Sequence, residues 1–441
     1  MSKATKNIDD LVSEIALADN IEKKREFAGE ILELGYARGV YPSSINELYM
    51  ARGRGEFTGF TVPAINLRTI TYDLARAIFR AAKKINAGAF IFEIAKSEMG
   101  YTAQPPAEYA SVCIAAAIKE NYKGPVFIQG DHFQVNTKKF KEDPTKEIGG
   151  MKDLIEHAVE AGFYNIDIDS STLVDLSQPT VEKEQELNNS VCAELTNFIR
   201  SIQPEGIEIS VGGEIGEVGK KNSTPEELRA FMGGFYKKLK KGNTGISKIS
   251  IQTGTAHGGV VLPDGSIAKV KLDFDTLKNM SEVARKEFGM AGAVQHGAST
   301  LPPEAFGKFS EVETAEVHLA TEFQNMVYES KSFPSDLRER IYGWIRKNLA
   351  TEKKTGETDE QFIYKARKKA LGPFKKDILG ISAKDRDNIA KEVEKKFDFL
   401  FGKLNIRDTH DIVSKYVTLK RVSRDKAKKA KRIELTGEGD D

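Results

Sequence analysis

The fold is decided by a stretch that reads PVFIQGDH, residues 125–132. Three apolar residues in a row, Val126 to Ile128, follow a Gly-Pro turn, which is typical of a short strand buried on both faces. A carboxylate and an imidazole, Asp131 and His132, come directly after it. We therefore expect a parallel strand that carries chemistry at its carboxyl end.

The same pattern occurs twice more along the chain. The segments are KISIQTGTAHG at 248–258 and AGAVQHG at 291–297, and each ends in a histidine followed by glycine. If the strands are parallel neighbours, His132, His257 and His296 converge on one point. Three converging imidazoles are the ligand set of a divalent transition metal, so the sequence predicts a metal tripod.

The composition sets limits on the class of protein. Of the 441 residues, 40% are hydrophobic and 30% are charged, as in a soluble globular protein. Lys and Arg number 66 against 65 Asp and Glu, which argues against a dedicated nucleic-acid or membrane binder. Cys113 and Cys192 have no disulfide or zinc-clip spacing, so we expect a cytoplasmic protein. No apolar run approaches the roughly 18–20 residues of a membrane helix.

Strand-like and helix-like segments alternate from Phe60 to about Ser330. Eight runs are strand-like: Phe60–Asn66, Ala89–Ala95, Pro125–Asp131, Asn165–Ser170, Ile207–Gly212, Lys248–Thr253, Ala291–Gln295 and Ala315–Ala320. Eight such units in this length predict an α/β fold, a closed (β/α)8 TIM barrel. A doubly wound open sheet is the alternative, but the first strand lacks the glycine-rich turn typical of it.

The remaining chain is assigned to extensions of the barrel. Residues 1–58 are expected to form an N-terminal helical extension, and 59–330 the catalytic barrel domain. Residues 331–408 are interpreted as an insertion and C-terminal helices that pack on the barrel. Residues 409–441 form a charged tail, for which we expect partial disorder.

Other strand ends also carry polar side chains. Asp169 ends the fourth strand, Glu214 the fifth, and His318 and Thr321 the eighth. Barrel enzymes place their chemistry at these ends. We expect Asp131 to move a proton on a substrate hydroxyl, and Asp169 and Glu214 to form a second metal position or to orient the histidines.

Glycines and hydroxyls near the last strands favour an anion site. Gly258 and Gly297 let backbone amides approach an anion closely, and Ser299 and Thr321 add hydroxyls. The loops after barrel strands seven and eight are a common phosphate-binding place. The expected substrate is therefore a phosphorylated polyol or sugar. Alternatively, the hydroxyls of Ser299 and Thr321 only stabilise a turn or cap a helix.

These residues resemble the class II, metal-dependent ketose-bisphosphate aldolases. The resemblance covers most of the barrel, in the segments Thr61–Asn66, Gly130–His132, Glu160–Phe163, Ile168–Ser171, Gly213–Gly216, Gly254–Gly258, His296–Ser299 and Ala320–Glu322. It implies that Asp131 is the proton donor, that His132, His257 and His296 hold zinc, and that Asp169 and Glu214 serve a second metal site. It further implies that Gly258, Gly297, Ser299 and Thr321 hold one phosphate.

The similarity to the family resumes near the C-terminus. Tyr364–Pro373 resembles the family's Asp-Pro-Arg-Lys helix, whose arginine contacts the far phosphate, often across a dimer. Arg367 is therefore expected to contact this phosphate, with an ordinary surface charge as the alternative. Within the barrel, the sequence departs from the family's pattern at three places. Gly212 stands where the family has a second glutamate, and the family's long proton-moving loop is missing after Gly219. His318 replaces the strand-eight asparagine that holds the ketose.

The resemblance implies a zinc-dependent aldolase that reversibly cleaves fructose or tagatose 1,6-bisphosphate to dihydroxyacetone phosphate and glyceraldehyde 3-phosphate. It also implies a homodimer or homotetramer and a monovalent cation beside the zinc. Two alternatives stay open: a metal-dependent sugar epimerase or aldolase of other specificity, and a non-catalytic aldolase-like subunit.

Overall fold

A computed structural model describes residues 7–216, 221–254, 262, 272–423, 435 and 437. Within these residues, eight parallel strands close into a barrel in the order β4-β3-β2-β9-β8-β7-β6-β5, with β5 pairing back to β4. The strands are β2 (Val62–Asn66), β3 (Ile91–Ala95), β4 (Gly124–Gln134), β5 (Asn165–Asp169), β6 (Ser210–Glu214), β7 (Lys248–Ile251), β8 (Ala293–Gln295) and β9 (Glu316–Leu319). The predicted (β/α)8 barrel is confirmed.

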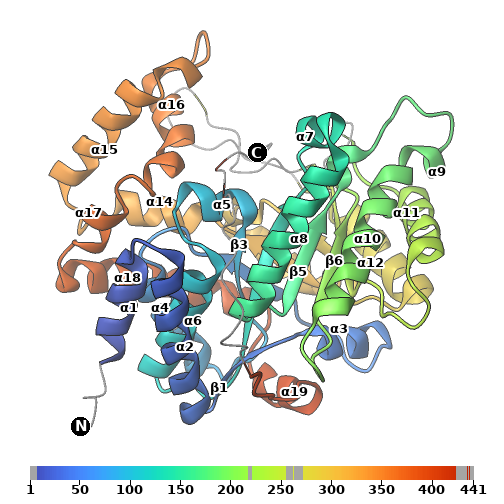
Figure 1. Ribbon diagram of the computed structural model, residues 1–441, viewed down its shortest axis with the longest axis horizontal. Helices are drawn as coiled ribbons and strands as arrows, with labels where there is room; N and C mark the ends of the chain where they lie inside the picture. The colour runs from blue at the N-terminus through green and yellow to red at the C-terminus, as the bar shows by residue number, and fades with distance from the viewer. Residues whose placement is uncertain are drawn as a thin grey trace.

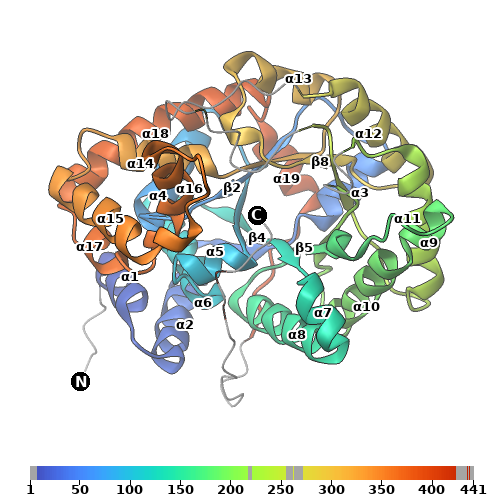
Figure 2. The ribbon, with the colours of Figure 1, turned by 90° about the horizontal axis from the view of Figure 1, so that it is seen from above.

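Helices surround the barrel as an outer ring (Figure 2). They are α4 (Thr71–Lys84), α5 (Lys96–Tyr101), α6 (Pro106–Lys119), α7 (Thr137–Glu142), α8 (Pro144–Ala161), α9 (Val181–Glu184), α10 (Glu186–Ile202), α11 (Pro225–Lys238), α12 (Phe274–Phe288), α13 (Phe306–Glu311) and α14 (Thr321–Glu329). Local sequence fixes their starts. In α11, Thr224 and Glu227 form a capping box and Pro225 takes the first helical position.

Strand β4 is longer than its neighbours, and each half pairs differently. Its first half pairs with an additional strand, β1 (Val40–Ser43), and its second half pairs with β5 across a bulge between Gly130 and Phe133. Within the bulge, His132 adopts a left-handed backbone with φ 38°. Consecutive strand residues normally point to opposite faces, so the bulge lets Asp131 and His132 both reach the barrel mouth.

The N-terminal segment contains α1 (Ile8–Leu17), α2 (Ile21–Arg38) and α3 (Asn46–Gly53). Helix α3 closes the amino-terminal end of the barrel. Its Arg52 donates to the Phe60 carbonyl at 2.6 Å and pairs with Glu313 at 2.9 Å, and its Tyr49 donates to Glu316 inside the barrel. This segment therefore contributes side chains to the barrel interior.

The C-terminal segment contains α15 (Ser335–Asn348), α16 (Asp359–Ala366), α17 (Lys375–Leu379), α18 (Ala383–Lys403) and α19 (Thr409–Tyr416). Helix α18 packs along α4, while α15, α16 and α17 form a group at one side of the molecule (Figure 1). The segment expected to be a tail begins with α19, and its His410 amide donates to the Asn86 carbonyl at 3.1 Å. No helix of the described chain has the length and apolar character needed to cross a bilayer.

Candidate active site at the barrel mouth

The carboxyl ends of the strands bring together six of the predicted site residues: Asp131, His132, Asp169, Glu214, His296 and His318. His132 lies at the centre of this group. Its Nδ1 is 3.2 Å from Asp169 Oδ2 and 3.2 Å from Glu214 Oε2, and its ring centroid is 4.1 Å from that of His296. The six residues come from the ends of five strands, β4, β5, β6, β8 and β9, and converge as expected from those positions.

His296 connects this centre to the other side of the mouth. Its Nε2 lies 2.8 Å from Ser250 Oγ, and its Nδ1 lies 3.9 Å from Asp131 Oδ1. Its ring centroid is 4.2 Å from the ring of His318. The three described histidines of the mouth therefore form one continuous row. His257 and Gly258, which were predicted to complete the metal and anion sites, lie outside the described residues.

The charges of this group favour a cation at its centre. Burial by itself would lower the pKa of His132, but Asp131 and Glu214 raise it well above its ordinary value. Burial by itself would raise the pKa of Asp131, but His132 and His318 bring it well below its ordinary value. The carboxylates thus stabilise positive charge on the imidazoles, and a divalent ion would supply that charge directly.

A transition metal fits the donors of the site. Ligand atoms of Asp131, His132 and His296 lie within 4.8 Å of one another, as do those of His132, Asp169 and Glu214. Imidazole nitrogen and carboxylate oxygen are the donors that zinc takes, at roughly 2.0–2.2 Å, which sets donor atoms roughly 3–4 Å apart. Small side-chain movements would gather either set around an ion.

The predicted anion-binding residues lie on the loops after β8 and β9. Gly297 has φ 64°, a left-handed conformation that favours glycine, and leads into a 3-10 turn, Ala298–Thr300. Ser299 Oγ accepts from the Glu322 amide at 3.4 Å, so it lies beside Thr321, the first residue of α14. The two hydroxyls and a helix amino terminus are therefore adjacent.

Arg367 is buried behind this helix. Its guanidinium donates to Asn325 and lies 3.1 Å from Glu329, both on α14, and it stacks on Tyr364 at 4.7 Å. Only 5% of its side chain is exposed. Its expected role at a far phosphate stays a prediction.

His318 lies between two carboxylates. Its Nδ1 is 3.0 Å from Asp131 Oδ1, and its Nε2 is 2.6 Å from Glu316 Oε1. Burial would lower its pKa, but Glu93 and Asp131 raise it well above its ordinary value. A second acid–base group therefore lies directly beside the predicted proton donor.

A second layer of polar side chains lies below the mouth, and sequence reasoning missed it. Four strands carry it two residues before the position that faces the mouth: Gln129 before Asp131, Asp167 before Asp169, Lys248 before Ser250, and Glu316 before His318. On β6 the same position is Gly212, before Glu214. Side chains two residues apart in a strand face the same side of the sheet. Polar or charged residues at this spacing, inside otherwise apolar strands, were therefore the sequence signal for this lower layer.

Lys248 is the centre of the lower layer. Its ammonium lies 2.9 Å from Asp167, 2.5 Å from Glu316 and 2.7 Å from Gln129, and only 1% of its side chain is exposed. Burial raises the pKa of Asp167 to about 6. For Glu316 burial acts the same way, but Lys248 and His318 outweigh it and lower the pKa to about 2.

Gly212 leaves room for this ion pair. A Cβ at this position would lie 2.3 Å from Asp167 Oδ1 and 3.0 Å from Lys248 Cε. Any side chain larger than glycine at this position would therefore collide with the Lys248 layer.

We expect Gly212→Ala to destabilise the protein by about 1–3 kcal/mol, because overpacking forces the buried ion pair apart. Urea unfolding would measure the loss. Gly233→Ala is the matched control, since a Cβ there has nothing within 4 Å. A Gly212→Ala variant as stable as wild type would contradict this packing.

Sequence reasoning also missed Asn66 and Glu98. Asn66 Nδ2 donates to Asp131 Oδ2 at 3.0 Å and to Glu98 Oε2 at 2.8 Å. Its buried Oδ1 has no hydrogen-bond partner among the described residues. Leaving a buried amide oxygen unsatisfied costs about 1–3 kcal/mol, so this atom is a candidate acceptor for a substrate hydroxyl. The sequence signal for Asn66 was its position as a polar residue at the end of β2, the first strand of the barrel.

The fold and the site define a class: a closed barrel with carboxylates and imidazoles gathered where barrel enzymes act. The sequence matches the family described as fructose-bisphosphate aldolase class-II over residues 54–403. The chain belongs to this family. A comparison with curated protein sequences found no significant match.

Solved structures share the fold at low sequence identity. A probable tagatose 6 phosphate kinase from Sinorhizobium meliloti 1021 has 15% identity and a TM-score of 0.53, over 81% of this chain and 99% of that one. A fructuronate-tagaturonate epimerase from Cohnella laeviribosi has 12% identity and a TM-score of 0.53, over 90% of this chain and 86% of that one. These similarities support the fold alone.

Proposed function

We propose that this protein is a metal-dependent aldolase that reversibly cleaves a ketose 1,6-bisphosphate, fructose or tagatose, to dihydroxyacetone phosphate and glyceraldehyde 3-phosphate. The observation that carries the proposal is the convergence of Asp131, His132 and His296 at the mouth of a barrel of the class II aldolase family. His132, His257 and His296 would hold a zinc ion, with Asp169 and Glu214 as a second position. We further propose a homodimer or homotetramer in the cytoplasm.

Asp131 would move the proton in this reaction. Cleavage requires that the hydroxyl on the carbon beyond the broken bond loses its proton, which a positioned carboxylate accepts. Asp131 is held from two sides, by Asn66 Nδ2 at 3.0 Å and His318 Nδ1 at 3.0 Å. A bound divalent ion would supply the positive charge that polarises the substrate carbonyl.

Metal removal tests the proposal. We expect a chelator to lower the cleavage of fructose or tagatose bisphosphate by on the order of 10²-fold or more, because such an ion supplies several kcal/mol of charge stabilisation. Added zinc should restore turnover, measured in a coupled assay for the triose products. Turnover that survives complete removal of metal, checked by mass spectrometry, would reject it.

His296→Ala should lose the metal, because it removes one of the converging imidazoles. His157→Ala is the matched control, since His157 lies on α8 and its Nδ1 is 2.7 Å from the Asp153 carbonyl, away from the mouth. Metal content measured on both proteins separates the site from a general effect of losing a histidine.

An epimerase is the second candidate, and the position of His318 favours it. Epimerisation needs a proton removed from one face of a carbon and returned to the other, and Asp131 and His318 are two adjacent acid–base groups. Deuterium from solvent appearing in a sugar whose carbon chain stays intact would support epimerisation over cleavage. A non-catalytic subunit, the third alternative, would be ruled out by stoichiometric zinc in the purified protein.

A further inference from the structure

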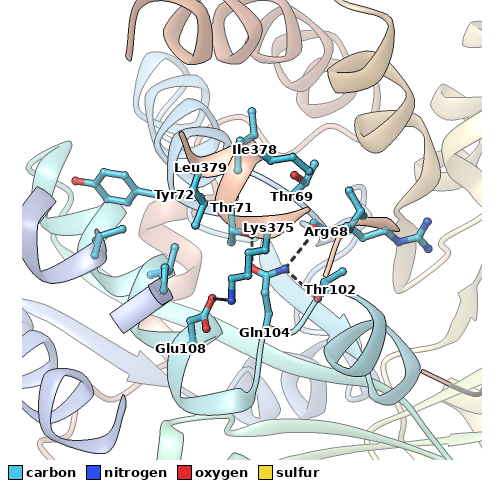
Figure 3. Close-up of a pocket in the computed structure, with 15 residues that line it drawn as sticks. Arg68, Thr69, Thr71, Tyr72, Thr102, Gln104, Glu108, Lys375, Ile378 and Leu379 are labelled. Atoms are coloured by element: carbon cyan, nitrogen blue, oxygen red, sulfur yellow. Dashed lines mark hydrogen bonds and ion pairs between the residues drawn. The ribbon is translucent and has the colours of Figure 1, made fainter. Parts of the chain in front are cut away.

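Arg68 lies on a turn that the structure fixes firmly. The turn follows β2, and its Ile70 has a left-handed backbone with φ 37°, which is unusual for a β-branched residue. Gln104 Nε2 donates to the carbonyls of Leu67 at 3.2 Å and Arg68 at 3.3 Å, and Thr71 Oγ1 donates to Gln104 Oε1 at 2.6 Å. Arg68, Thr71 and Gln104 line a cavity of about 40 Å³, and Figure 3 shows the Arg68 guanidinium pointing away from it.

From this turn, Arg68 connects the predicted anion site to a buried carboxylate. Its Nη1 donates to Thr321 Oγ1 at 3.2 Å, and its Nε donates to Glu98 Oε1 at 2.6 Å. Only 12% of the Arg68 side chain and 3% of the Glu98 side chain are exposed. A partly buried guanidinium therefore lies beside the first residue of α14, where Ser299 also lies.

The same carboxylate continues the chain to the predicted proton donor. Glu98 Oε2 accepts from Asn66 Nδ2 at 2.8 Å and from the Ala95 amide at 2.9 Å. The Asn66 amide group then donates to Asp131 Oδ2 at 3.0 Å. Four hydrogen bonds thus join Thr321 to Asp131 through Arg68, Glu98 and Asn66.

Two observations indicate that a ligand completes this arrangement. A guanidinium next to a hydroxyl and a helix amino terminus binds phosphate or carboxylate oxygens well. Independently, the buried Asn66 Oδ1 has no hydrogen-bond partner among the described residues, and a substrate hydroxyl would satisfy it. An anion with a hydroxyl a few atoms away fits both.

We propose that Arg68 binds the anionic group of the substrate beside Thr321. Glu98 and Asn66 link the guanidinium to Asp131 by hydrogen bonds, so that the position of the guanidinium fixes the position of the Asp131 carboxylate. Glu98 is a positioning residue in this scheme, and Asn66 positions Asp131 through its Nδ2 while its Oδ1 faces the substrate hydroxyl. The chain couples recognition of the charged end of the substrate to the placement of the group that moves the proton. The coupling of Arg68 to Asp131 rests on the proposed function, because its test measures turnover of the substrate.

Titration with inorganic phosphate tests the anion site without any catalytic assay. We expect wild type to bind phosphate and Arg68→Gln to bind it at least about tenfold more weakly. The affinity of Arg68→Lys should fall between them, since lysine keeps the positive charge but lacks the paired N–H donors of the guanidinium. Arg76→Gln is the matched control, because Arg76 pairs with Glu120 at 2.7 Å on the outer helices. Equal phosphate affinity in wild type and Arg68→Gln, or no binding by wild type, would overturn the assignment.

Glu98→Gln tests the positioning half. The new amide can still accept from Arg68, but its nitrogen then faces the Asn66 amide, so two donors meet and Asn66 must move. We expect kcat to fall at least about tenfold, with KM and phosphate affinity within about threefold of wild type. Asn66→Ser breaks the chain at its other end and should also lower kcat at least about tenfold with phosphate affinity within about threefold of wild type. It replaces Glu98→Gln if that variant does not fold.

The outcomes separate this inference from the proposed function. If wild type cleaves a phosphorylated ketose and both Glu98→Gln and Asn66→Ser keep its kcat, the positioning chain is wrong and the function stands. If wild type cleaves none, the proposed function fails, and the phosphate titration still decides whether Arg68 binds the anion.

Discussion

Asp131→Asn is expected to lower kcat for ketose bisphosphate cleavage by about 10²–10⁴-fold, the usual contribution of a positioned general acid or base. Asparagine keeps the shape of the side chain but cannot accept the proton. In the structure Asp131 is buried, and hydrogen bonds with Asn66 and His318 hold its carboxylate in place. Steady-state kinetics on fructose and tagatose bisphosphates would measure the loss.

Asp175→Asn is the control for this substitution. Asp175 lies in the loop after β5 at the same end of the barrel, but it is exposed and accepts from Ser177 and Gln178 within its own loop. Its replacement should leave kcat within about twofold, as for a surface substitution outside the site. An Asp131→Asn enzyme that keeps wild-type kcat, with its metal still bound, would assign proton transfer to another group, and His318 is the neighbouring candidate.

Much of the mouth could be predicted from the sequence because the barrel imposes a simple rule. Parallel strands end on one face, so side chains that follow the strands must meet there. Asp131, His132, Asp169, Glu214 and His296 follow this rule, and the structure brings them together. The predicted strand ranges also agree with the observed strands closely enough to identify each strand end.

Other features could not be predicted because they depend on packing between distant segments. Strand β1 was missed since it has four residues and contains Pro42, which is tolerated because β1 pairs on one side only, with β4. Arg68 and Glu98 look like ordinary surface charges in the sequence. Their pairing requires the turn after β2 to meet the start of α5, which only the closed barrel determines.

Lys248→Met is expected to lower the free energy of unfolding by about 3–5 kcal/mol, the usual cost of removing one partner from a buried ion pair. Methionine fills a similar volume, so a cavity contributes little and the effect reports charge. Asp167 and Glu316, 5% and 0% exposed, would lose the ammonium between them and keep only the His318 imidazole, 3.7 Å and 2.6 Å away. Chemical denaturation would measure the change, with Lys286→Met, 74% exposed, as a control expected to stay within about 0.5 kcal/mol.

The pH dependence of this loss distinguishes charge from packing. In wild type, Lys248 helps to hold the pKa of Glu316 at about 2, so this group stabilises the fold above its unfolded pKa and loses that contribution as pH falls through 2. Without Lys248, the folded pKa of Glu316 should rise, because His318 alone then opposes the effect of burial. Once the folded pKa lies above the unfolded value, stability falls as pH rises. The destabilisation should therefore be larger at pH 8 than at pH 5. A loss that is equal at both pH values would mean that Lys248 stabilises the barrel through packing, and not through its charge.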